Sequence, residues 1–239
     1  MRLRHSTRGR ETGRVMKSSN LIRWSGPALM IGGILGVVGL VIHPLSETAS
    51  DVTSSRWVPA HLLGFVSTIP LMFGLIGLYA RQAEETSRLG LLGFALTLIG
   101  AVSEGMELLW IEVIIFPFLI ANDPALYDSL RSSSAYLVAL ALSFLLFFGG
   151  WITFGAAMVR AAVLPRWTVW LVVMAVIPAI FILGLAVLVL SGVATASGLS
   201  GSGSPTILIF NIVGIVLSLS LVGWGYALWS DKRQATAQS

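Results

Sequence analysis

Six long apolar segments constrain this chain more than any other feature of its sequence. They span residues 24–42, 57–80, 89–116, 134–159, 167–190 and 206–229, and short polar stretches separate them. Each has close to the length of about 20 apolar residues that crosses a bilayer as a helix. Because lipid offers no partner for backbone N–H and C=O groups, each segment is expected to be helical. The sequence therefore predicts an all-α polytopic membrane protein with six transmembrane helices in one bundle.

The composition supports a membrane protein and excludes several classes of chemistry. Hydrophobic residues make up 56% of the 239 residues and charged residues 11%, whereas a soluble domain has about 25% charged residues. The chain has no cysteine, which excludes disulfides, thiol redox chemistry, iron–sulfur clusters and cysteine–zinc sites. No lysine lies inside an apolar segment, so a retinal Schiff base is excluded as well.

Basic residues are distributed unevenly between the two ends of the predicted bundle. The end that would hold both termini carries thirteen of the fifteen Lys and Arg residues: Arg2, Arg4, Arg8, Arg10, Arg14, Lys17, Arg23, Arg81, Arg88, Arg160, Arg166, Lys232 and Arg233. The opposite end carries only Arg56 and Arg131. Because cytoplasmic loops are enriched in Lys and Arg, both termini are expected in the cytoplasm. The basic residues behind the net charge of +4 are thus interpreted as a topology signal. Because no recognition motif accompanies them, no nucleic-acid partner is expected.

The chain is expected to form one membrane domain with no soluble module. Residues 24–230 form this domain, residues 1–23 form a basic tail with a composition compatible with disorder, and residues 231–239 form a second short tail. The outer loop at 191–205 is rich in Gly and Ser and is expected to be flexible. Met16 is an alternative to Met1 as the first residue.

Glycines recur at helical spacing in two of the segments. Gly32, Gly36 and Gly39 share one face of the first segment, and Gly93 and Gly100 share a face of the third. Small residues at such spacing let membrane helices approach closely. These two faces are therefore expected to pack against other helices.

The stretch "SEGMELLWIE", residues 103–112, places three glutamates inside apolar surroundings. If the third helix starts near Leu89, a rise of 1.5 Å per residue places Glu104 about 22 Å and Glu107 about 27 Å into the bilayer. Against a hydrocarbon core of about 30 Å, both lie in the outer half, and Glu112 lies at the outer interface. Ionisable residues in membrane segments are costly and mark functional sites.

Polar partners for these glutamates are predicted at the same depth. His43 ends the first helix, His61 lies one turn into the second, and both belong to the outer half. The sequence therefore predicts a site built from His43, His61, Glu104 and Glu107, with Arg56, Glu112 and Asn211 as further members. If the helices overhang the bilayer instead, these residues are ordinary interface residues.

Several functions remain open for such a site. The first is binding or transport of a small ligand or proton, since histidine–glutamate pairs can couple protonation to a change of shape. The second is a metal-dependent membrane enzyme in which His43, His61, Glu104 and Glu107 hold zinc, iron or manganese.

The third function is that of a subunit of an electron-transfer or photosynthetic complex, in which His43 and His61 bind haem b or a pigment. The fourth is that of a structural accessory subunit that partners other membrane proteins and has no chemistry of its own. No local motif in the sequence decides among these four functions.

The succession of "HP", "RWVPAH" and "GLIGLYARQ" resembles small multi-pass bacterial membrane proteins of uncharacterised function. The likeness covers the first half of the chain. It implies a place in the bacterial cytoplasmic (inner) membrane with the lipid bilayer as partner, and it assigns no residue a role.

Overall fold

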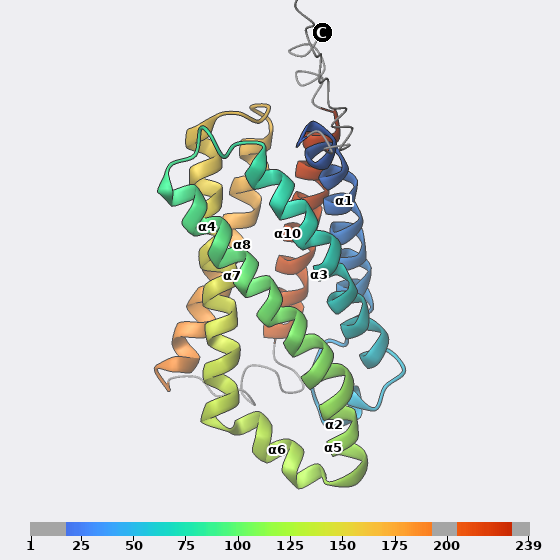
Figure 1. The fold of residues 1–239 in the computed structure, drawn as a ribbon. Coiled ribbons are helices and arrows are strands. Elements are labelled where there is room, and N and C mark those ends of the chain that lie inside the picture. The colour runs from blue at the N-terminus through green and yellow to red at the C-terminus, as the bar shows by residue number, and fades with distance from the viewer. Residues whose placement is uncertain (1–17, 193–204, 231–239) are drawn as a thin grey trace, which may run out of the picture.

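The computed structural model describes residues 18–192 and 205–230, and these residues form helices without any strand (Figure 1). Five of the described helices are long and apolar enough to cross a membrane. They are α1 (Ser18–Ile42), α3 (Trp57–Ala80), α7 (Ser134–Ala161), α8 (Thr168–Leu190) and α10 (Thr206–Ser230). The prediction of an all-α membrane protein is therefore confirmed. The tails at 1–17 and 231–239, and residues 193–204 of the predicted flexible loop, lie outside the described residues.

The third expected span, 89–116, is one helical run whose hydrogen-bond pattern changes along its length. It comprises α4 (Arg88–Met106), the π-helix η1 (Glu107–Ile115) and α5 (Phe116–Asn122). This run is not among the five described helices that qualify as membrane spans. A sixth transmembrane helix therefore remains a prediction.

Pro117 gives a physical reason for the π-helix. The N–H group of Phe116 donates to the carbonyl of Ile111, five residues back, which leaves the carbonyl of Glu112 without its α-helical donor. The π-helical donor to that carbonyl would be residue 117, which is proline and has no N–H group. The Glu112 carbonyl accepts instead from the indole Nε1 of Trp57, at 2.7 Å, from the neighbouring helix α3.

The helices pack as an antiparallel bundle with one diagonal member. α1 lies between α3 and α10, while α7 packs against α8 and α8 against α10. α4 begins against α7, and its continuation η1 ends against α3, so this run crosses the face of the bundle (Figure 1). The short helices α2 (Ala49–Val52), α5 and α6 (Pro124–Ser132) close one end. The first residues of α1 and the last residues of α10 lie at the opposite end of the bundle.

Two clusters of buried side chains hold this arrangement. In the main core Trp151 and Trp224 stack with ring centroids 5.1 Å apart, and Phe154 and Leu75 are fully buried beside them. A second cluster lies under the end closed by α2, α5 and α6, and contains Val52, Trp57, Phe116, Leu119 and Tyr127. This second cluster fixes α3 and η1 relative to the short helices.

Glycines make the closest helix contacts, as the sequence analysis predicts. An added Cβ at Gly93 would lie 2.4 Å from the backbone nitrogen of Phe154, and one at Gly100 would lie 2.3 Å from that of Phe147. Both contacts are with α7. On α1, Gly32 and Gly39 approach α3, whereas Gly36 approaches Ser218 of α10. Small residues therefore set the spacing of α4 to α7 and of α1 to both of its neighbours.

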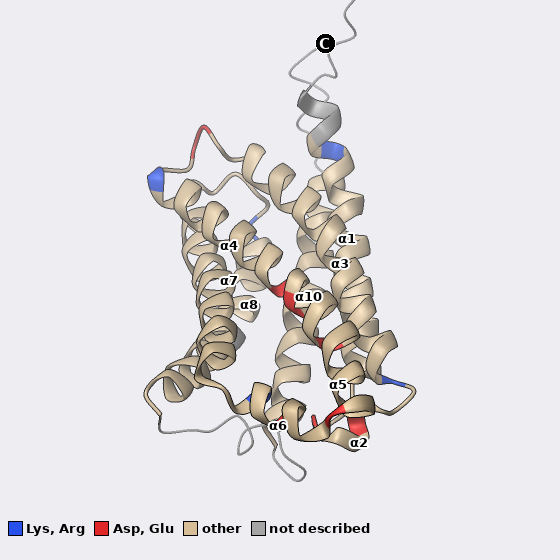
Figure 2. Cartoon of the chain, turned by 60° about the horizontal axis from the view of Figure 1, so that its bottom comes forward, with Lys and Arg blue, Asp and Glu red and all other residues tan. Residues whose placement is uncertain are grey.

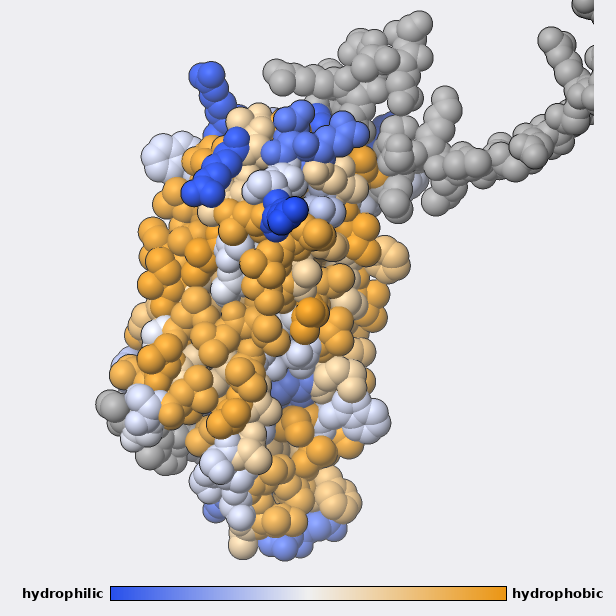
Figure 3. Space-filling model, turned by 60° about the vertical axis from the view of Figure 1, so that its left-hand side comes forward, coloured by the Kyte–Doolittle hydropathy of each residue, from blue (hydrophilic) through white to orange (hydrophobic). Residues whose placement is uncertain are grey.

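The outer surface matches a lipid environment. Large apolar side chains are exposed on every long helix, among them Ile34, Phe73, Leu142, Ile177 and Ile212. The space-filling view shows an apolar belt between two polar ends (Figure 3). Lys and Arg lie at the ends of the helices, whereas acidic residues also occur inside the bundle (Figure 2).

Candidate functional site

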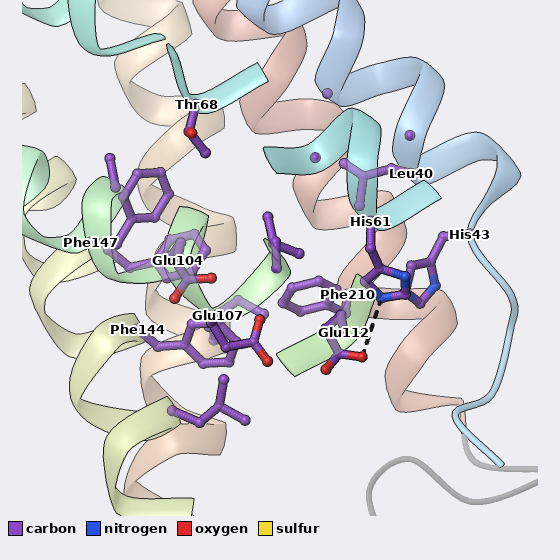
Figure 4. A pocket seen from close by; sticks show the side chains of 18 of the residues that line it. Leu40, His43, His61, Thr68, Glu104, Glu107, Glu112, Phe144, Phe147 and Phe210 are labelled. Atoms are coloured by element: carbon purple, nitrogen blue, oxygen red, sulfur yellow. Dashed lines mark hydrogen bonds and ion pairs between the residues drawn. The ribbon is translucent and has the colours of Figure 1, made fainter. Parts of the chain in front are cut away.

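A cavity of about 330 Å³ opens between the helices near the end closed by α2, α5 and α6. One part of its wall is apolar and comes from α7, α8 and α10, with Phe144, Phe147, Phe148 and Phe210 as the largest side chains. The other part is polar, and its titratable residues are His43, Glu47, His61, Glu104, Glu107, Glu112, Arg131 and Tyr136. Figure 4 shows the glutamates from α4 and η1 facing the histidines and the phenylalanine rings. The cavity is therefore amphipathic.

The two histidines are in direct contact. Their Nε2 atoms lie 3.2 Å apart. The Nδ1 atom of His43 lies 2.6 Å from the carbonyl oxygen of Pro44, and the Nδ1 atom of His61 lies 2.8 Å from that of Trp57. Because a carbonyl oxygen only accepts hydrogen bonds, both Nδ1 atoms carry hydrogen.

This contact lets the two histidines share a proton. A hydrogen bond between the two Nε2 atoms needs one proton, because two bare lone pairs would repel each other. The carboxyl group of Glu112 lies 3.8 Å from His61 Nε2 and faces this contact.

Trp57 connects the histidines to the π-helix. Its ring lies against His61 with a centroid distance of 4.3 Å, and its indole nitrogen donates to the backbone of Glu112. Trp57 is fully buried. The same residue therefore fixes the position of His61 and compensates the carbonyl that Pro117 leaves free.

Glu107 and Glu112 form a second pair. Their carboxyl groups hydrogen-bond to each other, and the Tyr136 hydroxyl donates to Glu107 Oε1 at 3.2 Å. Two carboxyl groups in such a contact can share a proton. The Oε2 atom of Glu112 is buried and accepts no hydrogen bond.

Glu104 lies one turn before this pair, on α4. Its Oε1 atom is buried, and no hydrogen bond reaches it. The side chain lines the cavity next to Phe144 and Phe147 (Figure 4). No basic side chain in the described residues forms an ion pair with Glu104. Among the described glutamates of the cavity, Glu104 is thus the least compensated.

Arg131 and Glu47 form an ion pair in the wall of the cavity. Arg131, on α6, forms an ion pair with Glu47 and donates to the Glu47 backbone carbonyl and to the hydroxyl of Tyr127. Burial opposes ionisation of Arg131, but Glu47, Tyr127, Tyr136 and Glu112 together outweigh it and raise the pKa of the guanidinium above its usual value. The guanidinium of Arg131 therefore stays ionised.

The structure brings together most of the residues singled out in the sequence. His43, His61, Glu104, Glu107 and Glu112 all line the one cavity. Glu112 is only 7% exposed, so it is not a wet interface residue. Arg56 is exposed before α3 and Asn211 is buried in α10, and neither lines the cavity.

Sequence reasoning missed Glu47, Arg131 and Tyr136 as members of the site, because it considered only polar residues of the predicted helices at the depth of the three glutamates. Arg131 is one of only two basic residues predicted on the outer side, and that rarity was a signal. Its partner could not be identified because Glu47 is 84 residues away in the chain.

The metal and haem alternatives gain no support from this geometry. Among the described residues, no group of three or more His, Cys, Asp or Glu side chains converges as a metal ion requires. A haem held by His43 and His61 would need its iron and macrocycle between the imidazoles, whereas their Nε2 atoms are in hydrogen-bond contact.

Comparisons with known proteins give no further indication of function. No family model, curated protein or solved structure matches this chain.

Proposed function

We propose that this protein spans the membrane six times with both termini in the cytoplasm, and that its outer-half cavity binds a small amphipathic ligand and exchanges protons. The observation that carries the proposal is the cavity itself. Its wall combines the titratable residues His43, His61, Glu104, Glu107 and Glu112 with four phenylalanines. Ligand sites are typically apolar concavities with a few convergent polar groups.

The arrangement of charges supports the proposed orientation. Among the described residues, the end at which α1 starts carries Arg23, Arg81, Arg88, Arg160 and Arg166, with Glu84 and Glu85. The opposite end carries Arg56 and Arg131 with Glu47, Asp51, Asp123 and Asp128. Excess Lys and Arg favour the cytoplasmic side. The run from α4 to α5 connects these two ends, as a sixth span would (Figure 1).

Thiol labelling of single-cysteine variants tests this topology. The chain contains no cysteine, so a variant has one labelling site and no background. We expect a membrane-impermeant maleimide added to intact bacterial cells to label Ser129→Cys, on exposed α6, and not Glu85→Cys, in the exposed α3–α4 turn. Both should be labelled after the cells are opened. Labelling of Glu85→Cys in intact cells would refute the proposed orientation. Labelling of both variants in intact cells would place residues 85 and 129 on the same side and would refute a single membrane crossing between them.

The size and wall of the cavity indicate the kind of ligand. Its volume of about 330 Å³ is at the lower end of the range of about 300–1,000 Å³ seen in small-molecule sites. An apolar group is favoured among Phe144, Phe147 and Phe210, and a polar group is favoured at the glutamates and histidines. A small amphiphile can place its apolar group against the phenylalanines and its polar group against the glutamates and histidines.

The proposed proton exchange is supported by two pairs of titratable groups. His43 and His61 lie in contact, as do Glu107 and Glu112, so each pair can share a proton. The other ionisable groups that face these pairs are Glu47, Glu104, Arg131 and Tyr136. A charged ligand that approaches either pair changes the electrostatic energy of its shared proton. Ligand binding is therefore expected to release or take up protons.

Calorimetric titration of the protein in phosphatidylcholine nanodiscs tests the proposed function. The probes are octylammonium, octanoate and octanol, which share a tail and differ in charge, and empty nanodiscs correct for partition into lipid. At least one probe should bind stoichiometrically, with a heat that depends on the ionisation enthalpy of the buffer. That dependence measures proton exchange.

Cavity-filling variants locate the binding. Ala141→Phe on α7 and Ala186→Phe on α8 each add a ring to the cavity wall and should abolish binding. Ala156→Phe adds the same ring to an exposed position of α7 outside the cavity and should bind as the natural chain does. Absence of binding by all three probes, or unchanged binding in both filled variants, would contradict the proposal.

A further inference from the structure

One carboxyl group of the cavity, that of Glu104, has no ion-pair partner among the described residues. Glu112 lies 3.8 Å from His61 Nε2, and Arg131 forms an ion pair with Glu47. Glu104 then remains, and an ionised carboxylate in an apolar cavity is stable only with a counter-charge or a bound proton.

Two carboxylate oxygens in the cavity also lack hydrogen-bond donors. They are Oε1 of Glu104 and Oε2 of Glu112. Glu112 is 7% exposed, so water does not reach it freely. A buried acceptor without a donor is costly, and a ligand that supplies an N–H or O–H group removes that cost. A ligand with several donors serves these oxygens best.

Aromatic rings lie beside these acceptors. Phe144 and Phe210 have ring centroids 5.9 Å apart, and Phe147 lies on the same wall (Figure 4). Phenylalanine rings attract cations through their faces and also contact alkyl chains. The described part of the cavity wall offers only Arg131 as a permanent cation, and its partner is Glu47.

We propose, on the basis of the function above, that the ligand is a protonated primary or secondary amine with an apolar tail. The ammonium group lies at Glu104 and donates to its unpaired Oε1 atom. The tail lies among Phe144, Phe147 and Phe210. A quaternary ammonium has the charge but no N–H donor, so it is a poorer ligand, and a carboxylate would be repelled by Glu104.

The probe series of the calorimetric experiment, extended by octyltrimethylammonium, tests this ligand class. We expect octylammonium to bind at least about tenfold tighter than octanol, octanoate or octyltrimethylammonium, since a charge-assisted hydrogen bond is the difference between them. Glu104→Gln should weaken octylammonium binding by about tenfold or more and leave octanol binding unchanged. Glu84→Gln, at an exposed position in the α3–α4 turn away from the cavity, should bind octylammonium like the natural chain.

The outcomes separate this inference from the proposed function. If octanol or octanoate binds as tightly as octylammonium, the cavity binds amphiphiles but the amine assignment is wrong. Equal binding of octyltrimethylammonium would refute the role of the N–H donor. If no probe binds, both proposals fail. Glu112→Gln provides a second test if Glu104→Gln does not fold, because it alters the other unpaired carboxylate oxygen.

Discussion

Gly150→Ala is expected to destabilise the protein by about 3 kcal/mol, the upper end of the usual range for overpacked sites. The added Cβ would lie 2.3 Å from the backbone nitrogen of Thr97 and 2.8 Å from its Cα atom. These are backbone atoms of α4, so no side chain can rotate away, and α4 has to move from α7. Thermal unfolding in detergent should show a midpoint lowered by roughly 6–12 °C.

Gly149 provides a matched control one residue earlier in α7. No atom lies within 4 Å of a Cβ added there. Gly149→Ala is therefore expected to raise stability slightly, by about 0.5–1 kcal/mol, since alanine is the better helix former. Equal loss of stability in both variants would show that the α4–α7 contact is not as close as described. Because Glu104 lies on α4, Gly150→Ala should also weaken ligand binding.

Trp57→Phe is expected to lower the free energy of unfolding by about 1–3 kcal/mol, because the buried carbonyl of Glu112 loses its hydrogen-bond donor. The smaller ring also removes packing around His61. Trp110→Phe, on the exposed side of η1, is the control and should change stability by no more than about 0.5 kcal/mol. The measurement is again thermal unfolding in detergent.

A double-mutant cycle with Pro117→Ala isolates the hydrogen bond from the packing. The alanine of this variant would have an N–H group five residues after Glu112, and this group can donate to the free carbonyl. The loss of stability caused by Trp57→Phe should therefore be at least about 1 kcal/mol smaller in the Pro117→Ala background than in the natural chain, because only the loss of packing remains there. An equal cost in both backgrounds would refute Pro117 as the reason for the interhelical hydrogen bond.

Hydropathy and glycine spacing were sufficient to predict much of the fold. The apolar segments at 24–42, 57–80 and 134–159 correspond closely to α1, α3 and α7. The exception is the segment at 89–116, where the helical run changes to a π-helix. Sequence alone could not predict η1, because a proline in a membrane helix can be accommodated by a kink, a bulge or a neighbouring donor.

The positions of the titratable residues along the predicted spans indicated which of them belong to one site, and five of them line one cavity. Depth could not distinguish residues that face the cavity from those that do not. Arg56 and Asn211 have a suitable depth, but Arg56 is exposed and Asn211 lies off the cavity. The rotation of each helix about its axis depends on packing with its neighbours, which a single sequence does not give.

The sequence by itself determined that this chain is a helical membrane protein with glutamates in apolar surroundings, because the hydrophobic effect and backbone hydrogen bonding act on local composition and length. Only the tertiary structure decided how these glutamates are compensated. The contact between His43 and His61, the Trp57 donor to Glu112 and the Arg131–Glu47 pair join residues on different helices. Hydrogen bonds act over about 3 Å, so their partners depend on helix rotation and spacing, which glycine contacts such as that of Gly150 set.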